Sequence, residues 1–280
     1  MALIKPTLYK QIVTEKLGSK ALIKNMAKDI GTFVNGDKGG TISFPRFKRI
    51  GGATEVVRDK AKTPNELEQE EAKAYIKHVE APPIKIYDKD DIEALGHQAD
   101  NGAKQQAEAI DYKFDLDLAD EMDTTVLKAH CADKKHITED ELMNSMLLFG
   151  DDRDVSQFTN GGVIIHSGLI SDFLKMQSFV NASNTTVQQF NGICRNNCLG
   201  YWQGIPVIYT NHGTEVNGEY RTFILKNDAI GYKEKQDITT EDFRPQGLYR
   251  TDMYTSAMYA VKLIDEDGCV CIKNSNPATK

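Results

Sequence analysis

A run of about thirty residues without a proline, from Asp100 to Cys131, constrains the fold of this chain more than any other feature. Apolar side chains recur within it at every fourth position, and alanines extend the row at both ends: Ala103, Ala107, Ile110, Phe114, Leu118, Met122, Val126 and Ala129. Because an α-helix turns once in about 3.6 residues, this spacing places the row on one face of a helix. Such a helix measures roughly 45 Å, more than twice the average length, and its apolar face predicts that it lies on a sheet.

The remaining surface of this predicted helix is acidic. Lys113 is the only base between residues 111 and 123, against six acidic residues: Asp111, Asp115, Asp117, Asp120, Glu121 and Asp123. Such a cluster can bind a metal ion or act in acid–base chemistry, but charged residues on an amphipathic helix are far more often a solvated face. We therefore expect these carboxylates to face water, where a segment of opposite charge can lie across them.

The composition excludes several functional classes. The net charge is −7 and the pI about 5.5, which argues against a nucleic-acid-binding surface spread over the whole protein. No stretch reaches about eighteen apolar residues, so no transmembrane helix is expected, and the first residues lack the apolar core of a signal peptide. The five cysteines have no framework spacing, and we expect them to be reduced thiols in a cytoplasm.

Residues 1–38 have the character of an arm rather than of a core. They carry seven lysines, three acidic residues and thinly spread apolar side chains, with a break at Gly18 and Ser19. Short helical pieces fit this composition, and we expect them to need a neighbouring surface to order them.

A ribbon-like projection is predicted for residues 39–82. Residues 41–50 alternate as a strand, and Pro45 restricts this strand to the edge of a sheet. A second strand, an acidic run and a return strand follow in turn, at 54–60, 65–71 and 74–80, before two prolines at 82 and 83. A ribbon of this kind has little core of its own, so it should rest on something else.

The second half of the chain alternates strands with short helices. Thr138 and Glu141 form a capping box, which opens a helix that ends at Gly150. Apolar runs and glycine turns predict the later elements: a strand at 163–166, a helix at 167–176, strands at 199–209 and 223–232, and a last strand pair formed by 253–264 and 268–272. The predicted fold class is α+β, with the long helix lying on the late sheet.

No motif for catalysis is found. The sequence lacks the glycine-rich phosphate loops, the Gly-x-Ser-x-Gly nucleophile motif and the His-Glu-x-x-His zinc motif. It does contain potential zinc ligands: His130, Cys131, His136, Cys194, Cys198, Cys269 and Cys271. Neither cysteine pair has zinc-knuckle spacing, so we expect structural thiols and no catalytic residue, cofactor or metal. A cytoplasmic metal-dependent enzyme that uses this set is the alternative from a different class.

Several stretches, taken in order, resemble the parts of one known family. They are Gly40-Thr-Ile-Ser-Phe-Pro-Arg-Phe47, Ala74-Tyr-Ile-Lys77, Asp88 to Cys131, Gly204-Ile-Pro-Val-Ile-Tyr209, Asp228-Ala-Ile-Gly231 and Tyr254 to Ala260. They are similar to the rising and descending strands of the extended loop, the spine helix, the Gly-x-Pro-Val strand of the axial domain and the closing segment. The family is the major capsid proteins of tailed bacteriophages, with the Hong Kong 97-type fold.

This resemblance implies a domain order and a function. The implied parts are an N-terminal arm at 1–38, an extended loop at 39–82, a peripheral domain with the spine helix at 83–137, an axial domain at 138–224, and a return to the peripheral sheet at 225–280. The implied function is a self-assembling shell subunit without enzyme activity, which forms hexamers and pentamers around the phage genome. We expect a separate scaffolding protein and a portal as partners, non-specific contact with packaged DNA, no membrane partner, and assembly in the host cytoplasm. A nanocompartment shell of the encapsulin type is the nearest alternative.

The resemblance also implies a contact between subunits, because the family's extended loop lies across the neighbouring spine helix. The predicted loop is basic at Arg46, Lys48 and Arg49. The predicted helix is acidic at Asp111, Asp115, Asp117 and Asp120. We expect these opposite charges to meet between subunits, although charges on an edge strand can also serve only to keep it soluble.

Overall fold

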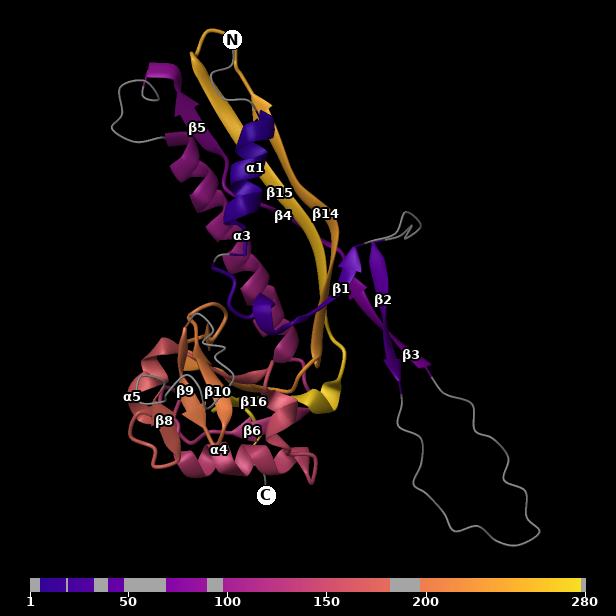
Figure 1. Ribbon diagram of the computed structural model, residues 1–280, viewed down its shortest axis with the longest axis vertical. Helices are drawn as coiled ribbons and strands as arrows, with labels where there is room; N and C mark the ends of the chain where they lie inside the picture. Colours follow the sequence, from indigo (N-terminus) through magenta and orange to yellow (C-terminus); the bar gives the residue numbers. More distant parts are fainter. Residues whose placement is uncertain are drawn as a thin grey trace, which may run out of the picture.

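Two β-sheets and one long helix organise the chain (Figure 1). The computed structural model describes residues 6–18, 20–32, 40–47, 69–89, 98–181 and 197–277. Its mixed helices and sheets confirm the predicted α+β class. An elongated part holds the helix and a five-stranded sheet, and a second part at the other end holds a seven-stranded sheet.

The long helix, α3 (Gln98–Met122), is shorter than predicted. Its apolar row is buried as far as Met122, but the row fails at Val126, whose side chain is 68% exposed. The helix ends because Thr125 donates its hydroxyl proton to the carbonyl oxygens of Glu266 and Cys269, and the chain then enters β6 (Leu127–His130). The pairing of β6 with β16 thus prevails over the helical periodicity, which continues in the sequence for two more turns.

The five-stranded sheet lies along α3 and confirms that the helix rests on a sheet formed late in the chain. Its strands run in the order β1-β14-β15-β4, and β5 pairs with β15 further along. Their bounds are β1 (Lys28–Thr32), β4 (Lys77–Glu80), β5 (Ile84–Tyr87), β14 (Ile230–Phe243) and β15 (Arg250–Leu263). The hairpin of β14 and β15 is antiparallel from the pair Ile230–Leu263 to the pair Phe243–Asp252.

The seven-stranded sheet has the order β6-β16-β13-β7-β10-β9-β8. Besides β6, its strands are β7 (Gly162–Ile165), β8 (Phe179–Asn181), β9 (Cys198–Trp202), β10 (Ile205–Tyr209), β13 (Thr222–Leu225) and β16 (Cys269–Lys273). Between β10 and β13 in the chain, β11 (Glu215–Val216) and β12 (Glu219–Tyr220) form a separate two-stranded sheet. All residues of β7 and β13 are buried, as expected for central strands covered on both faces.

The predicted last strand pair is wrong. β15 pairs with β14, whereas β16 lies in the other sheet between β6 and β13. The reason is that Cys269, Val270 and Cys271 are all buried, so β16 is a central strand that needs cover on both faces. A 3-10 turn at Glu266–Gly268 carries the chain from one sheet to the other.

The capping box at Thr138 is confirmed, and it opens α4 (Glu139–Met146). A 3-10 turn at Leu147–Phe149 continues α4 to Gly150, which has a positive φ of 62°. The predicted helix at 167–176 is a 3-10 turn at Ser167–Leu169 followed by the short α5 (Ile170–Phe173).

The projecting ribbon is a two-stranded antiparallel sheet of β2 (Thr41–Phe47) and β3 (Gln69–Tyr75) (Figure 1). Pro45 lies in this two-stranded sheet, so its edge position is confirmed. The ribbon rests on the body through Phe44, whose 1% exposed side chain belongs to an apolar cluster with Ala260 of β15. The predicted return strand is split near Ile76 between β3 and β4, and the predicted strand at 54–60 lies outside the described residues.

Candidate functional site: the arm and the carboxylates of α3

The N-terminal arm packs on α3 within the same subunit, which corrects the prediction that it is not part of a core. α1 (Pro6–Lys16) contacts both α3 and β14, and the side chains of Tyr9 and Val13 are fully buried. The Tyr9 hydroxyl donates to Gln106 Oε1 of α3 over 2.8 Å, and the Thr255 hydroxyl of β15 donates to the same oxygen over 2.7 Å. One buried amide of α3 therefore joins the arm to the sheet.

Asp111 is the first of two carboxylates that hold the segment after α1. Its oxygens accept the backbone N–H of Gly18 at 2.9 and 3.0 Å and that of Lys20 at 3.3 Å. The side chain is only 1% exposed. Burial raises the pKa of Asp111 above its usual value, although the hydrogen bonds from Gly18 and Lys20 favour the charged form.

Asp115 holds the next part of the same segment, one helical turn further along α3. Its Oδ2 accepts the backbone N–H of Leu22 at 2.8 Å, and its Oδ1 accepts those of Ile23 and Lys24 at 3.1 and 3.0 Å. His212, from the loop after β10, places Nδ1 2.9 Å from Asp115 Oδ2. We name Asp111 and Asp115 the arm clamp, because together they hold backbone N–H groups of five arm residues.

Asp117 faces the sheet rather than the arm. Its Oδ1 is 2.9 Å from Nζ of both Lys77 and Lys113, and its Oδ2 accepts the hydroxyl proton of Tyr259 at 2.8 Å. Burial alone would raise the pKa of Asp117, but the hydrogen bonds from Lys113, Lys77 and Tyr259 outweigh it and hold the pKa below its usual value. Burial is also the main cause that raises the pKa of Tyr259.

Asp120, in the last turn of α3, and Asp123, just after the helix, bind residues within or next to the seven-stranded sheet. Arg221, which is 3% exposed, places Nη2 3.0 Å from Asp120 Oδ1 and Nη1 3.3 Å from Asp123 Oδ2. Lys273 of β16 contacts Asp123 at 2.8 Å. Burial would raise the pKa of Asp123, but the Lys273 ammonium and the Cys271 thiol donate hydrogen bonds that leave it lowered.

The prediction of a solvated acidic face is therefore wrong for three of the six acids, because Asp111, Asp115 and Asp117 are at most 3% exposed. The arm clamp binds backbone N–H groups, which almost every residue has. The residue types of the arm therefore give no sign in the sequence that these two carboxylates are buried. A usable signal was position, since residues 111 and 115 follow directly after the apolar residues 110 and 114.

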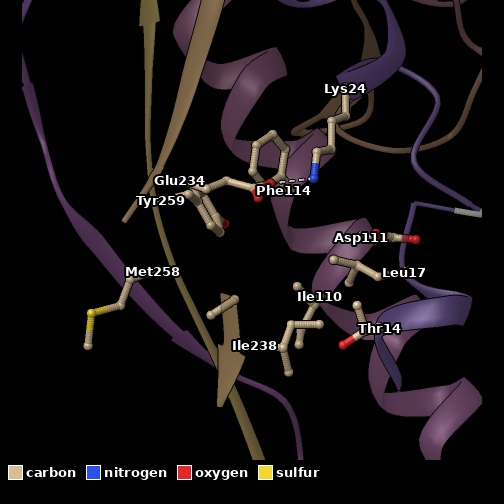
Figure 2. Close-up of a pocket in the computed structure, with 11 residues that line it drawn as sticks. Thr14, Leu17, Lys24, Ile110, Asp111, Phe114, Glu234, Ile238, Met258 and Tyr259 are labelled. Carbon is tan, nitrogen blue, oxygen red and sulfur yellow. Dashed lines mark hydrogen bonds and ion pairs between the residues drawn. The ribbon is translucent and has the colours of Figure 1, made fainter. Parts of the chain in front are cut away.

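A small pocket of about 140 Å³ lies between the arm, α3 and the hairpin of β14 and β15 (Figure 2). Lys24 of the arm forms an ion pair with Glu234 of β14 at 2.5 Å, and its Nζ lies 4.8 Å from the centroid of the Phe114 ring. The lining is otherwise mostly apolar, with Leu17, Ile110 and Ile238 among its residues. These contacts hold the arm in position. The residues that line the pocket include no nucleophile paired with a base.

Of the three loop residues predicted to contact a neighbouring subunit, the structure describes only Arg46. Arg46 donates to the carbonyl oxygens of Ile264 and Leu263 at 2.7 and 3.0 Å, and it forms an ion pair with Glu266 at 2.7 Å. It therefore fixes the ribbon to its own subunit. Lys48 and Arg49 lie outside the described residues, and among the four predicted acids only Asp120 is exposed.

Three of the five cysteines lie in the core, and Cys198 is half-buried. Cys131, Cys269 and Cys271 are buried, and Cys194 lies outside the described residues. Burial raises the pKa of Cys131 to about 11. Within the described parts of the chain, no three histidine, cysteine or acidic side chains gather closely enough to hold a metal ion. No helix in those parts is long and apolar enough to cross a membrane.

No protein-family model and no curated protein matches this sequence, but solved structures match the fold. The capsid of the cyanophage P-SCSP1u aligns with a TM-score of 0.61 at 14% identity, over 92% of this chain and 89% of the other. The capsid of an empty GTA particle gives 0.65 at 10% identity, over 93% and 91%. The virus-like particle from Pyrococcus furiosus gives 0.61 at 11% identity, over 95% and 98%.

The chain has a phage-capsid fold. The resemblance drawn from the sequence is thereby confirmed at the level of the fold. The match covers nearly the whole of both chains in each of these alignments.

Proposed function

We propose that this protein is the major capsid protein of a tailed phage, which assembles with copies of itself into the icosahedral shell around the genome. The full-length capsid fold carries this proposal, since 93% of the chain aligns with 91% of a capsid chain. Almost no part of the described chain is left to build a separate active site. In this proposed role the protein has no enzyme activity and uses no cofactor.

The ribbon of β2 and β3 supports the proposal. A two-stranded ribbon is marginally stable in water on its own, and this one projects from the body beyond its buried base (Figure 1). A neighbouring subunit is the natural surface to cover it. The proposed partners are therefore other copies in hexamers and pentamers, together with a separate scaffolding protein, a portal and non-specifically held DNA. Assembly takes place in the host cytoplasm.

Electron microscopy of the purified protein, beside light scattering of the same sample, tests the proposal. The expected result is closed shells, or hexamer and pentamer rings at lower concentration. A monodisperse compact monomer at high concentration contradicts it. Assembled shells that are purified from cells and contain a specific protein instead of DNA favour the alternative, a nanocompartment of the encapsulin type.

A further inference from the structure

One face of the five-stranded sheet is covered by α3. On the other face the ribbon packs against β15 at Ala260, and the part of this face nearer the tip of the hairpin lies beyond that contact. On β15, Thr255 and Tyr259 point to α3, because they bond to Gln106 and Asp117. Side chains alternate along a strand, so Asp252 and Tyr254 point to the opposite face. The cross-strand pairs Phe243–Asp252 and Asp252–Lys85 place Phe243, Asp252 and Lys85 in one row on that opposite face.

The outer end of this open face is aromatic. Tyr87 pairs with Arg250 and so lies on the same face, where it is 43% exposed, and Phe243 is 57% exposed. Tyr249, at the tip of the hairpin, is 76% exposed. Figure 1 shows this tip beside the end of β5, at the opposite end of the molecule from the seven-stranded sheet. Clustered exposed aromatic side chains are typical of protein interfaces.

Two unpaired charges of opposite sign flank these aromatic residues. Glu241 of β14 pairs with Tyr254 in the register, so it shares the open face, and Lys85 of β5 lies on the other side of β15. Both are exposed, and neither has an ion-pair partner among the described residues. With one strand between them and an offset of two residues along it, their backbone positions are about 12 Å apart. Their neighbour Arg250 is already paired, with Nε 3.1 Å from Asp252 Oδ1.

These residues can form a contact with the same residues of a second copy. An acid on one side and a base on the other are too far apart to pair within one subunit, but they can pair between two copies related by a two-fold axis. The aromatic residues between them then supply the apolar centre, and the two charges supply the rim of the contact. A two-fold contact of this kind can join subunits of neighbouring rings in a closed shell.

We propose that the tip surface, formed by Lys85, Tyr87, Glu241, Phe243 and Tyr249, docks on the tip surface of a second copy, with Glu241 of each copy facing Lys85 of the other. This inference rests on the proposed function, because it names one of the contacts that would join subunits in the shell. The partner is another copy of this chain.

Charge reversal tests the contact. Lys85→Glu and Glu241→Lys should each raise the protein concentration needed for assembly at least about fivefold, the factor that corresponds to about 1 kcal/mol per contact. The double variant restores the pair with its charges exchanged, so its threshold should return towards that of the wild type. Lys134→Glu is the matched control, because Lys134 is exposed and lies outside the tip surface, between β6 and α4. Circular dichroism checks that each variant is folded.

The outcomes separate the two proposals. A wild-type protein that forms no assemblies contradicts the shell function itself. Wild-type thresholds in both single variants contradict the tip contact and leave the shell function standing. Impaired single variants without recovery in the double variant contradict the pairing of Lys85 with Glu241. If a charge variant fails to fold, Tyr249→Ser decides instead, because this side chain is 76% exposed and its loss should impair assembly alone.

Discussion

His212 Nδ1 lies 2.9 Å from Asp115 Oδ2, and this contact brings the loop after β10 onto the helix turn that also holds the arm. Gly213, the next residue, approaches α3 so closely that a Cβ atom there would lie 2.6 Å from the Ala119 Cβ. The arm, α3 and the seven-stranded sheet thus meet around one buried carboxylate. A change at Asp115 is transmitted to all three, which makes it the most informative residue to substitute.

Asp115→Ala should reduce the free energy of unfolding by about 3 kcal/mol or more, because the N–H groups of Leu22, Ile23 and Lys24 would lose their acceptor. Denaturant melts of the unassembled subunit measure this loss. The matched control is Asp242→Ala, an exposed acid of β14, with an expected change within about 0.5 kcal/mol. Equal stabilities of the two variants would mean that the arm clamp contributes nothing to folding.

Such a loss would contradict the expectation of a solvated acidic face, because substituting an exposed acid usually changes the free energy of unfolding by at most about 0.5 kcal/mol. The sequence correctly predicts the long helix as far as Met122 and the capping box at Thr138, because these depend on local periodicity and capping. It does not predict which acids are buried, since their partners are backbone groups and residues such as Arg221, which are distant in sequence. It also does not predict the sheet of β16, because a buried strand has the same apolar pattern in either sheet.

Phe114→Ala should destabilise the subunit by about 3–5 kcal/mol, as is usual when a large buried side chain is truncated. Phe114 is 3% exposed and its ring centroid lies 4.3 Å from that of Tyr259. Tyr112→Ala, on the same helix at 46% exposure, is the control and should cost much less. A larger loss for Tyr112→Ala in denaturant melts would show that the assigned face of α3 is wrong.

The stability of the subunit should fall in acid, and two aspartates should contribute with opposite signs. The folded pKa of Asp117 is lowered, so its contribution is present above the unfolded value of 3.8 and is lost as the pH falls through the folded pKa. The folded pKa of Asp111 is raised above 3.8, so its contribution is greatest in acid and is lost as the pH rises through the folded pKa. Asp117→Asn should therefore flatten the acid limb of a stability–pH curve, and Asp111→Asn should steepen it. Parallel curves for both variants would contradict the assigned shifts.

The cysteines should behave as ordinary thiols. Replacing both Cys194 and Cys198 with serine should leave assembly intact and should release no stoichiometric zinc, because zinc-binding proteins hold the metal through several ligands at once. Light scattering measures assembly, and elemental analysis of the purified wild type measures the metal. One tightly bound zinc per subunit would support the metal-dependent enzyme instead.

The basic residues beyond β2 should contribute to contact between subunits. Arg46 is left unchanged in this test, because its bonds to the carbonyl oxygens of Leu263 and Ile264 hold the ribbon in place, and its loss would confuse folding with assembly. Lys48→Glu combined with Arg49→Glu should leave the subunit folded and slow its assembly. Of the four acids predicted to meet them, only Asp120 is exposed, and it also pairs with Arg221 of its own subunit. Since surface ion pairs are worth only about 0–1 kcal/mol each and are screened by salt, the effect should be largest at low ionic strength. Wild-type assembly kinetics across the whole salt series would mean that these two side chains only keep the strand soluble.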